Sequence, residues 1–242
     1  WVIIGKGSNL LVADAGYRGA VITLASEFSR FVVGEDGCTI TVGAGAILAR
    51  LVNEALSREL TGLEFAVGIP GTVGGAISMN AGSRTEWIGS LVRDVVTYKP
   101  GEGIRHYSGE QIAWGYRLCG LPHDEIVLEA TLELGQATKD DIRARMERAL
   151  TRRRRTQPLG VPSCGSVFKN PPDRAVGAMI EECGLKGFCQ GGAEVSSVHA
   201  NFIVNKGAAT AADVEAVIRH VHAKVRETYG VELQPEVKFL GF

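Results

Sequence analysis

Three polar side chains of different chemistry stand close together in the segment "PSCGSVFKNPP", residues 162–172. Ser166 offers a hydroxyl, Lys169 an ammonium and Asn170 a carboxamide, next to an apolar pair. A buried strand normally carries apolar side chains instead of these polar groups, and the flanking prolines restrict the backbone. Two interpretations remain: a turn that is simply polar, or a stiffened loop that presents the three groups to a ligand.

Two glycine-rich segments could approach a ligand through their backbone. The first, "GKGSNLLV" (5–12), follows a strand-like run, so its glycines let the chain turn and expose N–H groups to an anion. It lacks the third glycine and the following helix of a dinucleotide-binding fingerprint, and it lacks the spacing of a P-loop. On the residues alone it is either a phosphate cradle or a tight hairpin.

The second segment, "GIPGTVGGAISMNAG" (68–82), is denser in glycine than ordinary turns require. Each glycine loses much conformational freedom on folding, and turns alone do not explain so many of them. Glycine also lets a backbone come close to a flat or phosphorylated ligand. The pattern therefore favours a ligand-lining segment.

Three isolated polar residues have an ordinary structural explanation as well as a functional one. Arg117, in "WGYRLCG" (114–120), could simply stack on its aromatic neighbours. Glu236 alternates with apolar residues, a pattern typical of the wet side of a closing strand. His199 precedes a strand, where a lone histidine is usually a structural residue.

The arginine run 152–155 invites a nucleic-acid interpretation that the rest of the chain does not support. Lys and Arg total 26 against 27 Asp and Glu, for a net charge of -1, whereas nucleic-acid-binding domains carry a basic excess. Cations at a helix C-terminus also complement the helix dipole. We therefore interpret the run as a solvated helix end, and we expect no nucleic-acid or membrane partner.

Apolar periodicity predicts the elements that must hold these residues. We expect a last helix that begins at Thr210, where Asp213 completes a capping box, and that ends before Gly230. A hairpin is expected around Pro100–Gly103. The other predicted helices are 47–60, 140–155 and 176–183, and predicted strands include 1–4, 20–24, 31–33, 38–45, 125–134, 199–205 and 235–242.

Length and composition bound the domain count and the compartment. A chain of 242 residues can hold two modest domains, and the prolines at 158 and 162 favour a boundary there. No run approaches the roughly 18 apolar residues of a membrane span. Five scattered cysteines without a C-x-x-C pair favour a reducing compartment over a disulfide framework or a zinc site. We expect a mixed α+β fold without a metal.

Taken together and in this order, the segments resemble the UDP-N-acetylenolpyruvoylglucosamine reductase family. The resemblance covers essentially the whole chain and implies a FAD-binding domain of the vanillyl-alcohol-oxidase (PCMH-like) type in two subdomains, plus a small α+β substrate-binding domain. The spacing is similar to the shorter family type, and we expect the N-terminal part of the first subdomain to be missing here. The segments that carry it are "GKGSNLLV", "GIPGTVGGAISMNAG", "YR", "QPLGVPSCGSVFKNP", "GLKGF", "GGAEVSSVHANFIVNKG" and "PEVKFLG".

The resemblance implies domains and site residues. Residues 1–157 would form the FAD-binding domain, residues 158–234 the substrate domain, and residues 235–242 a strand that returns to the FAD domain. The family keeps its catalytic residues at Arg117, Ser166 and Glu236, and it holds the UDP-sugar at Asn170, Lys186 and His199. The residues implied at the cofactor are Gly5, Lys6, Gly7, Ser8, Asn9, Leu10, Pro70, Gly71, Thr72, Gly74, Gly75, Ala76, Asn80, Ala81 and Gly82.

The chemistry that the resemblance implies is reduction of the enolpyruvyl ether of UDP-N-acetylglucosamine-enolpyruvate to UDP-N-acetylmuramate, for peptidoglycan synthesis. The cofactor would be non-covalent FAD and the co-substrate NADPH. Arg117 and a protonated Glu236 would stabilise charge that develops toward the substrate carboxylate. Ser166 would then protonate the carbon next to the one that received hydride. The expected protein is a cytoplasmic monomer.

Two departures from the family pattern bear on the site, and two other classes of protein remain as alternatives. Cys119 stands where the family usually has serine, and "SRTEW" (83–87) stands where it usually has Ala-Tyr-Gly. A flavin oxidase or dehydrogenase acting on another substrate would lack Ser166 and Glu236 together. A non-catalytic flavin- or nucleotide-binding module would need no arranged acid.

Overall fold

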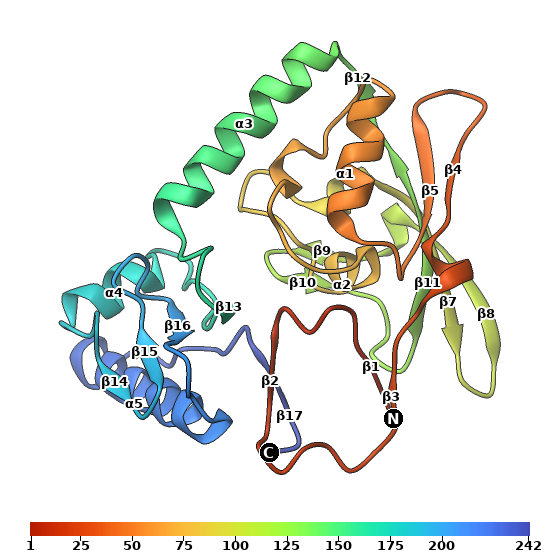
Figure 1. Ribbon diagram of the computed structural model, residues 1–242. Coiled ribbons are helices and arrows are strands. Elements are labelled where there is room, and N and C mark those ends of the chain that lie inside the picture. Colours follow the sequence, from red (N-terminus) through yellow and green to blue (C-terminus); the bar gives the residue numbers. More distant parts are fainter. The chain divides into compact units, whose positions relative to one another are not determined.

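The computed structural model describes all of residues 1–242, which form two compact units (Figure 1). Unit 1 comprises Trp1–Lys6 and Ala20–Thr151, and unit 2 comprises Gly7–Gly19 and Arg152–Phe242. Each unit encloses an apolar core of its own. The N-terminal glycine segment is therefore divided between the two units.

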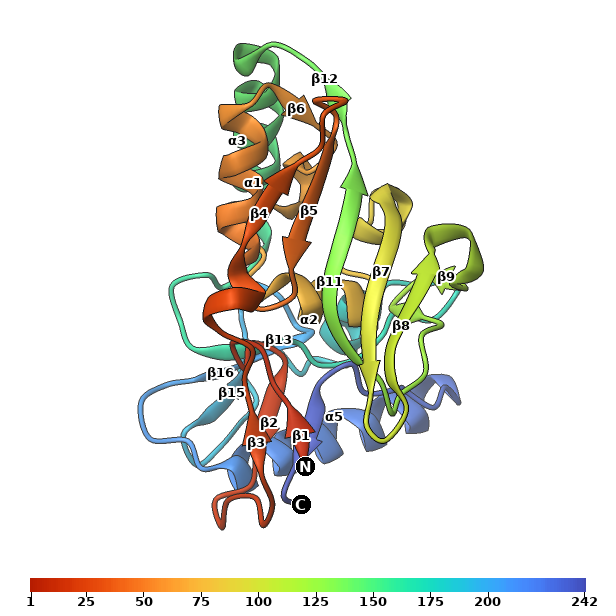
Figure 2. The same cartoon turned by 90° about the vertical axis from the view of Figure 1, so that its right-hand side faces the viewer.

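Unit 1 is built around a five-stranded antiparallel sheet in the order β4-β5-β11-β7-β8 (Figure 2). The hairpin between β7 and β8 forms as predicted, with Lys99 opposite Gly103. Helices α1 and α2 lie on one side of the sheet (Figure 1). The bounds are β4 Phe31–Val33, β5 Thr39–Gly43, β7 Val92–Lys99, β8 Gly103–Ser108, β11 Ile126–Glu133, α1 Leu48–Ser57 and α2 Val73–Ser78.

The helix α1 confirms the predicted apolar stripe, and α2 is a helix that the sequence did not predict. Leu48, Leu51, Val52 and Ala55 of α1 are buried in the core of unit 1. In contrast, α2 lies inside the glycine-dense segment, and the side chain of its N-cap Thr72 accepts from the N–H of Gly75. A short helix is possible here because the cap and the surrounding backbone satisfy its first N–H groups.

Short pairs of strands complete unit 1. The strand β1 (Val2–Ile3) runs parallel to β3 (Val21–Ile22), and β6 (Leu60–Thr61) is antiparallel to β12 (Gly135–Gln136). A hairpin joins β9 to β10 and is described with the site. Four 3-10 turns link these elements: η1 Ser26–Ser29, η2 Glu64–Ala66, η3 Ile88–Leu91 and η4 Gly109–Gln111.

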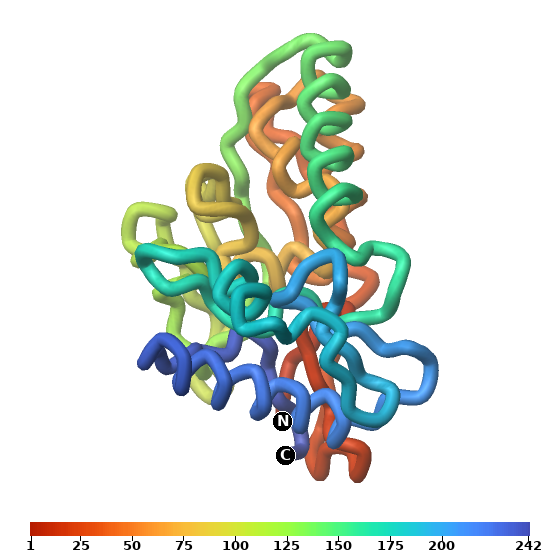
Figure 3. Tube along the Cα trace, turned by 90° about the vertical axis from the view of Figure 1, so that its left-hand side faces the viewer, coloured from red at the N-terminus to blue at the C-terminus, as the bar shows by residue number.

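Unit 2 holds a four-stranded antiparallel sheet in the order β13-β16-β15-β14, on which the long helix α5 packs (Figure 3). The predicted ends of α5 are confirmed, because Thr210 and Asp213 form a capping box and Gly230 has a φ of 67°. A parallel pair joins β2 to β17. The bounds are β2 Leu10–Val12, β13 Ser163–Ser166, β14 Cys189–Gln190, β15 Ala193–Val195, β16 Phe202–Asn205, β17 Lys238–Leu240, α4 Val176–Glu182 and α5 Ala211–Tyr229.

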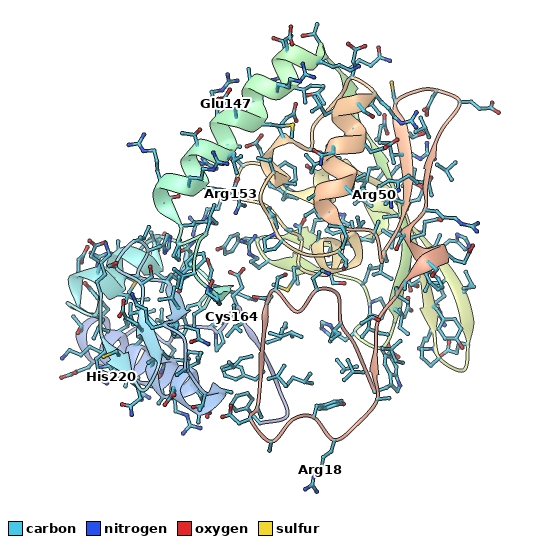
Figure 4. All side chains as sticks on the ribbon, viewed as in Figure 1. Arg18, Arg50, Glu147, Arg153, Cys164 and His220 are labelled. Atoms are coloured by element: carbon cyan, nitrogen blue, oxygen red, sulfur yellow. The ribbon has the colours of Figure 1, made fainter.

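The helix α3 (Lys139–Thr156) contains the division between the units, at residues 151 and 152. Ile142 is its single fully buried residue. The predicted solvated end is confirmed, since Arg152, Arg154 and Arg155 are exposed. Arg153 is half-buried and donates to Oε1 of Gln157 at 3.1 Å (Figure 4).

The two compact units differ in their limits from the domains that the sequence analysis expected. The strand β17 pairs with β2, and both belong to unit 2 although β2 lies within the expected FAD-binding domain. Compactness does not say which residues contact a flavin. The assignment of residues 1–157, 158–234 and 235–242 to functional domains therefore stays a prediction. None of the helices is both long and apolar enough to cross a bilayer.

A buried carboxylate braces the sheet of unit 1. The side chain of Glu125 is 1 % exposed, and it accepts from Thr97 Oγ1 at 2.5 Å and from the hydroxyl of Tyr107 at 2.8 Å. Arg105 lies 3.7 Å from the same carboxylate. A buried carboxylate is tolerated only when its oxygens are paired, so the strands β7 and β8 are tied to the residue that precedes β11.

Replacing Thr97 by valine tests this brace. Thr97→Val keeps the shape but removes the donor to a buried carboxylate, so the free energy of unfolding should fall by about 1.5–3 kcal/mol. Thr41→Val is the matched control, because the hydroxyl of Thr41 bonds only a neutral partner, Oγ1 of Thr131, at 2.9 Å. It should lose about 0.5–1.5 kcal/mol. Equal losses in denaturant titrations would contradict the special role of Glu125.

Candidate active site

The two glycine segments predicted to hold one cofactor meet in unit 1. A Cβ atom at Gly5 would stand 2.5 Å from Oγ1 of Thr72, so only glycine permits this approach. Gly74 is required for a similar reason, since its Cβ would lie 2.8 Å from that of Ala44. The first N–H groups of α2 are already used: Val73 and Gly74 donate to the carbonyls of Ala46 and Ala44 at 2.9 and 2.8 Å.

One glycine of α2 is not explained by the protein's own packing. A Cβ at Gly75 would meet only Oγ1 of Thr72, at the ordinary contact distance of 3.5 Å. Glycine inside a helix is less stable than alanine by roughly 0.5–1 kcal/mol. A residue that destabilises the helix and leaves a side-chain-sized space fits a group that approaches from outside the chain. The segment thus fits the flat or phosphorylated ligand that its composition predicts.

Arg117 sits at the tip of a tight hairpin with a strained backbone. The strands β9 (Trp114–Gly115) and β10 (Leu118–Cys119) leave a two-residue turn between them. Arg117 has a φ of 53°, a left-handed conformation that costs a non-glycine residue about 1–3 kcal/mol. Its Nη1 donates to the carbonyl of Gly82 at 2.8 Å, and its guanidinium lies 5.3 Å from the centre of the Tyr116 ring. The arginine is therefore held against the second glycine segment.

Asn80 stabilises the same hairpin through its side chain. Its side chain is buried, its φ is 43°, and both ends of its carboxamide are engaged. The Nδ2 group donates to the carbonyl of Gly115 at 2.8 Å, and Oδ1 accepts from the N–H of Gly89 at 3.0 Å. These bonds give Asn80 a structural role that the sequence analysis did not consider. Its contact with the cofactor stays a prediction.

Ser166 ends a strand that is distorted just before it. The register of β13 against β16 shifts between Ser163 and Ser166, and Gly165 has a φ of 80°. Cys164 of the same strand is buried in the core (Figure 4), and burial raises the pKa of its thiol. Such bulges turn a side chain away from the direction that a regular strand would give it. The half-buried Ser166 is thus presented by a bend whose positive φ favours glycine at 165.

Glu236 is buried, although its alternation with apolar residues was typical of the solvent-exposed side of the closing segment 235–242. Only 7 % of the residue is exposed, so the expectation of a wet face is wrong for Glu236. The reason is that this part of the segment is covered by the chain beside Ser166: Glu236 N–H donates to the carbonyl of Val167 at 2.7 Å. The Nδ2 group of Asn9 donates to the carbonyl of Glu236 at 2.9 Å. Unit 2 therefore brings together Ser166, Glu236 and part of the first glycine segment.

The three residues predicted at the UDP-sugar lie around helix α4. Asn170 accepts through Oδ1 from the N–H of Val176 at 2.9 Å, and Lys186 pairs with Glu181 at 2.7 Å. His199 lies against the start of the same helix, since a Cβ at Gly177 would be 3.1 Å from its Cε1. Burial lowers the pKa of His199, and the nearby Lys186 lowers it further, so the imidazole is neutral at physiological pH.

The two departures from the family pattern both lie beside Arg117. Cys119 is a buried residue of β10 in the hairpin itself, and desolvation raises the pKa of its thiol. The turn "SRTEW" is held by the hydroxyl of Ser83, which accepts from the N–H groups of Thr85 and Glu86 at 3.2 and 3.1 Å. This turn carries Arg84 to 5.6 Å from the Tyr116 ring, so two arginines lie over one aromatic side chain.

The predicted site residues thus fall into two clusters. Arg117 lies with Gly5, Thr72 and Gly82 in unit 1, whereas Ser166 and Glu236 lie with Asn9 and the α4 residues in unit 2. The stacking of Arg117 on an aromatic neighbour, one of the two interpretations of this residue, is found with Tyr116. Asn201 was missed by the sequence analysis, and the available signal was an asparagine directly before an apolar strand. No group of three or more His, Cys, Asp or Glu could hold a metal ion.

Comparisons with known proteins match both parts of the chain. Residues 1–99 match the FAD binding domain family, and residues 157–240 match the family described as UDP-N-acetylenolpyruvoylglucosamine reductase, C-terminal domain. The chain is 46 % identical over its whole length to such a reductase from Heliobacterium modesticaldum, covering 77 % of it. It is 42 % identical to that of Halalkalibacterium halodurans, covering 80 % of it.

A solved structure agrees with these matches. The crystal structure of UDP-N-acetylenolpyruvylglucosamine reductase from Thermus caldophilus superposes with a TM-score of 0.87 at 39 % identity, over 99 % of this chain and 85 % of that one. Fold and matched domains together define a flavoprotein, with a FAD-binding domain of the PCMH type joined to a reductase C-terminal domain. The chain belongs to the UDP-N-acetylenolpyruvoylglucosamine reductase family. The resemblance and the α+β fold expected from the sequence are confirmed.

The bonds of Asn80 predict a loss of stability that does not depend on flavin. Asn80→Ala leaves the buried N–H of Gly89 and the partly buried carbonyl of Gly115 without their partner, so the free energy of unfolding should fall by about 1–3 kcal/mol. The fall should be the same with flavin bound or removed. Asn53→Ala, at an exposed position of α1, is the control and should not destabilise. If Asn80→Ala kept its stability and only lost flavin affinity, Asn80 would be a ligand residue and not a brace.

Proposed function

We propose that this chain reduces the enolpyruvyl ether of UDP-N-acetylglucosamine-enolpyruvate with NADPH, and that Arg117, Ser166 and Glu236 are its catalytic residues. The enzyme class, a UDP-N-acetylmuramate dehydrogenase of peptidoglycan precursor synthesis, follows from membership of the family. The residue roles, the use of NADPH and a monomeric, cytoplasmic enzyme are the proposed parts.

We assign cofactor binding to the two glycine segments. Gly5–Asn9 with Leu10 would hold the diphosphate part of FAD, and Gly68–Gly82 would line the cofactor, where Gly75 leaves space for a close approach. When bound, FAD would take up hydride from NADPH and supply it to the terminal carbon of the substrate's double bond. None of the five histidines stands in a convincing attachment motif, so we expect the cofactor to be non-covalent.

Arg117 would stabilise the negative charge that the substrate acquires. Addition of hydride to the CH₂ carbon pushes an electron pair toward the carboxylate, which gives an enolate-like species. A fixed planar cation lowers the free energy of that species more than that of the neutral double bond. The bond to Gly82 and the contact with Tyr116 hold the guanidinium in advance, so it need not reorganise during the reaction.

Ser166 would complete the reduction by donating its proton to the adjacent carbon. The electron pair of the enolate-like species forms the new C–H bond, the O–H bond of Ser166 breaks, and solvent later returns a proton to the serine. A serine is a weak acid in water, but a carbanionic carbon within reach is a strong enough base. Glu236 would donate a hydrogen bond or a proton to the carboxylate, which requires its carboxyl group to be protonated.

The UDP-sugar would be held around α4 by Asn170, Lys186 and His199. Lys186 carries a cation suited to a phosphate, and the neutral His199 can exchange hydrogen bonds without adding charge. We propose that NADPH uses the same site before the sugar enters. Shared use of one site would prevent both from binding together.

The observation that best supports these roles is the backbone hydrogen bonding between the segment that follows Ser166 and the segment that carries Glu236. Phe168 pairs with Pro235, and Lys169 N–H donates to the carbonyl of Gln234 at 2.9 Å. With the bond from Glu236 to Val167, these contacts hold the segment after Ser166 against the segment that carries Glu236. Residues 70 positions apart in sequence are thereby fixed on one framework, as a proton donor and a charge-stabilising group would need.

Separate measurement of the two half-reactions tests the role of Ser166. Ser166→Ala should leave flavin binding and flavin reduction by NADPH nearly unchanged. Flavin reoxidation by the enolpyruvyl substrate should slow by about 10²–10⁴, the usual contribution of one general acid. Ser166→Cys keeps a transferable proton and should recover part of the rate.

A neighbouring hydroxyl provides the control for Ser166. Ser163 lies on the same strand, and its Oγ accepts only a long 3.4 Å bond from the N–H of Gly165. Ser163→Ala should reoxidise at the parent rate in stopped-flow experiments. If Ser166→Ala also reoxidised at that rate, Ser166 would be a turn residue and the proposed proton transfer would be wrong.

Substitution of Arg117 should affect the same half-reaction for a different reason. Arg117→Ala should lose most of the rate of flavin reoxidation, whereas reduction by NADPH should change much less. Arg117→Lys should recover only part, because a point charge does not replace a planar fork. Arg50→Ala is the control, since Arg50 also lies over an aromatic ring of unit 1, 5.1 Å from Phe31, without a proposed role (Figure 4). Equal losses in both half-reactions would indicate a flavin-site or folding role for Arg117.

A further inference from the structure

Asn201 holds the backbone next to Ser166 with both ends of its side chain. It is 4 % exposed and directly precedes β16. Its Oδ1 accepts from the N–H of Phe168 at 3.0 Å, and its Nδ2 donates to the carbonyl of the same residue at 2.8 Å. Its own backbone carbonyl accepts from the N–H of Val167 at 2.9 Å. Three hydrogen bonds therefore run from Asn201 to the two residues that follow Ser166.

The carboxamide of Asn201 continues the hydrogen-bonding pattern of β13 with β16 beyond the point where the regular strand pairing stops. The regular pairing of β13 with β16 stops at Ser166, which lies opposite Phe202. A carboxamide presents one donor and one acceptor, like a peptide group, so it can replace the missing strand residue opposite Phe168. On its other side the same segment bonds Gln234 and Glu236. The residues after Ser166 are thus fixed between Asn201 and the segment of Glu236.

Asn201 is also bonded to the histidine of the substrate cluster. Its N–H donates to Nδ1 of His199 at 3.2 Å. Phe202 N–H donates to the carbonyl of His199 at 2.9 Å, which closes the turn. A single residue therefore connects the backbone after Ser166 to the side chain of His199.

We propose that Asn201 is a positioning residue, which fixes the hydroxyl of Ser166 relative to Glu236 and His199. The inference rests on the proposed function, in which Ser166 donates the proton. Asn201 need not touch the substrate. It acts through the backbone of Val167 and Phe168, and a shift of that backbone would move the serine away from the carbon that it protonates.

Exchange of the amide for a carboxyl group gives a sharp test. An ionised carboxylate at position 201 can accept from Phe168 N–H but cannot donate to its carbonyl, whereas a protonated carboxyl group can do both. Burial disfavours the ionised form and so raises the pKa of the introduced group. Asn201→Asp should therefore behave like the parent at pH below that pKa and should become defective as the pH rises through it.

The defect should appear in one half-reaction only. At alkaline pH, Asn201→Asp should reoxidise its flavin with the enolpyruvyl substrate about 10²-fold more slowly, the size of effect that a misplacement of about 1 Å can cause. Reduction by NADPH should keep the parent rate at every pH. Amide hydrogen exchange of the peptide that contains Phe168 should become faster than in the parent at the same pH, and this ratio should grow over the same pH range. It is a readout independent of activity.

Asn205→Asp is a closely matched control. Asn205 lies on β16 as well, but its Oδ1 only accepts, from the N–H groups of Gly207 and Ala209 at 2.7 and 3.1 Å. A carboxylate can make both bonds, so this variant should show no defect. The titratable groups around position 201 are His199 on its own turn, Glu181 and Lys186 beside that histidine, and Lys169 and Glu236 on the facing segments. On α5, His222 lies against Phe168 and pairs with Glu232. All of these groups are unchanged in both variants, so the difference between the pH profiles isolates position 201.

A double substitution separates this inference from the proposed function. If Asn201 acts through Ser166, adding Asn201→Asp to Ser166→Ala should slow reoxidation no further. If flavin reoxidation is slow in Ser166→Ala but has the parent rate in Asn201→Asp, only the positioning role is overturned. If reoxidation has the parent rate in Ser166→Ala, the proposed function itself is overturned.

Two other outcomes would also overturn the positioning role. One is an equal loss in both half-reactions of Asn201→Asp, and the other is a loss that does not vary with pH. If the aspartate variant does not fold at alkaline pH, Asn201→Ser supplies the test, because it has no group that titrates in this range. Its reoxidation should be slowed at all pH values, and a parent rate for this variant would contradict the inference.

Discussion

A buried backbone group must find a hydrogen-bond partner, and in this protein two buried carboxamides satisfy that requirement beside irregular segments. Asn80 in unit 1 bonds Gly89 and Gly115, and Asn201 in unit 2 bonds both polar groups of Phe168. Each lies under an irregular segment that carries a proposed catalytic residue. The irregular backbone that carries Arg117 and Ser166 is stabilised because an asparagine side chain bonds its peptide groups in each unit.

Glycine has two different uses in the two segments that we propose bind the cofactor. Gly5 and Gly74 are needed by the chain itself, since a side chain there would collide with Thr72 or Ala44. Gly75 is not needed in this way, and its small loss of helix stability is compatible with a ligand that occupies the space. A glycine-rich sequence can therefore reflect either tight packing of the chain or contact with a ligand. The atoms that surround each glycine show which reason applies.

The proposed chemistry is divided between the two compact units. Unit 1 supplies the cation, held by Gly82 and Tyr116, while unit 2 supplies the serine and the carboxyl group on one hydrogen-bonded framework. Each part is organised by short-range contacts within its own unit. The strained φ of Arg117 is maintained by these contacts, because a non-glycine residue does not favour it. The bend before Ser166 needs less support, because Gly165 adopts its positive φ readily.

The sequence by itself determined the family, the α+β class, the capped helix α5, the hairpin between β7 and β8 and the solvated arginine run, because these depend on periodicity, caps and motif order. Only the tertiary structure decided that Glu236 is buried and that a helix lies inside the glycine segment. The same holds for the bracing of Arg117 and Ser166 by Asn80 and Asn201. These features depend on hydrogen bonds between residues far apart in the chain, such as Glu236 with Val167. A local pattern carries no information on such partners. The alternating pattern around Glu236 therefore favoured a solvent-exposed strand face, although the chain after Ser166 covers it.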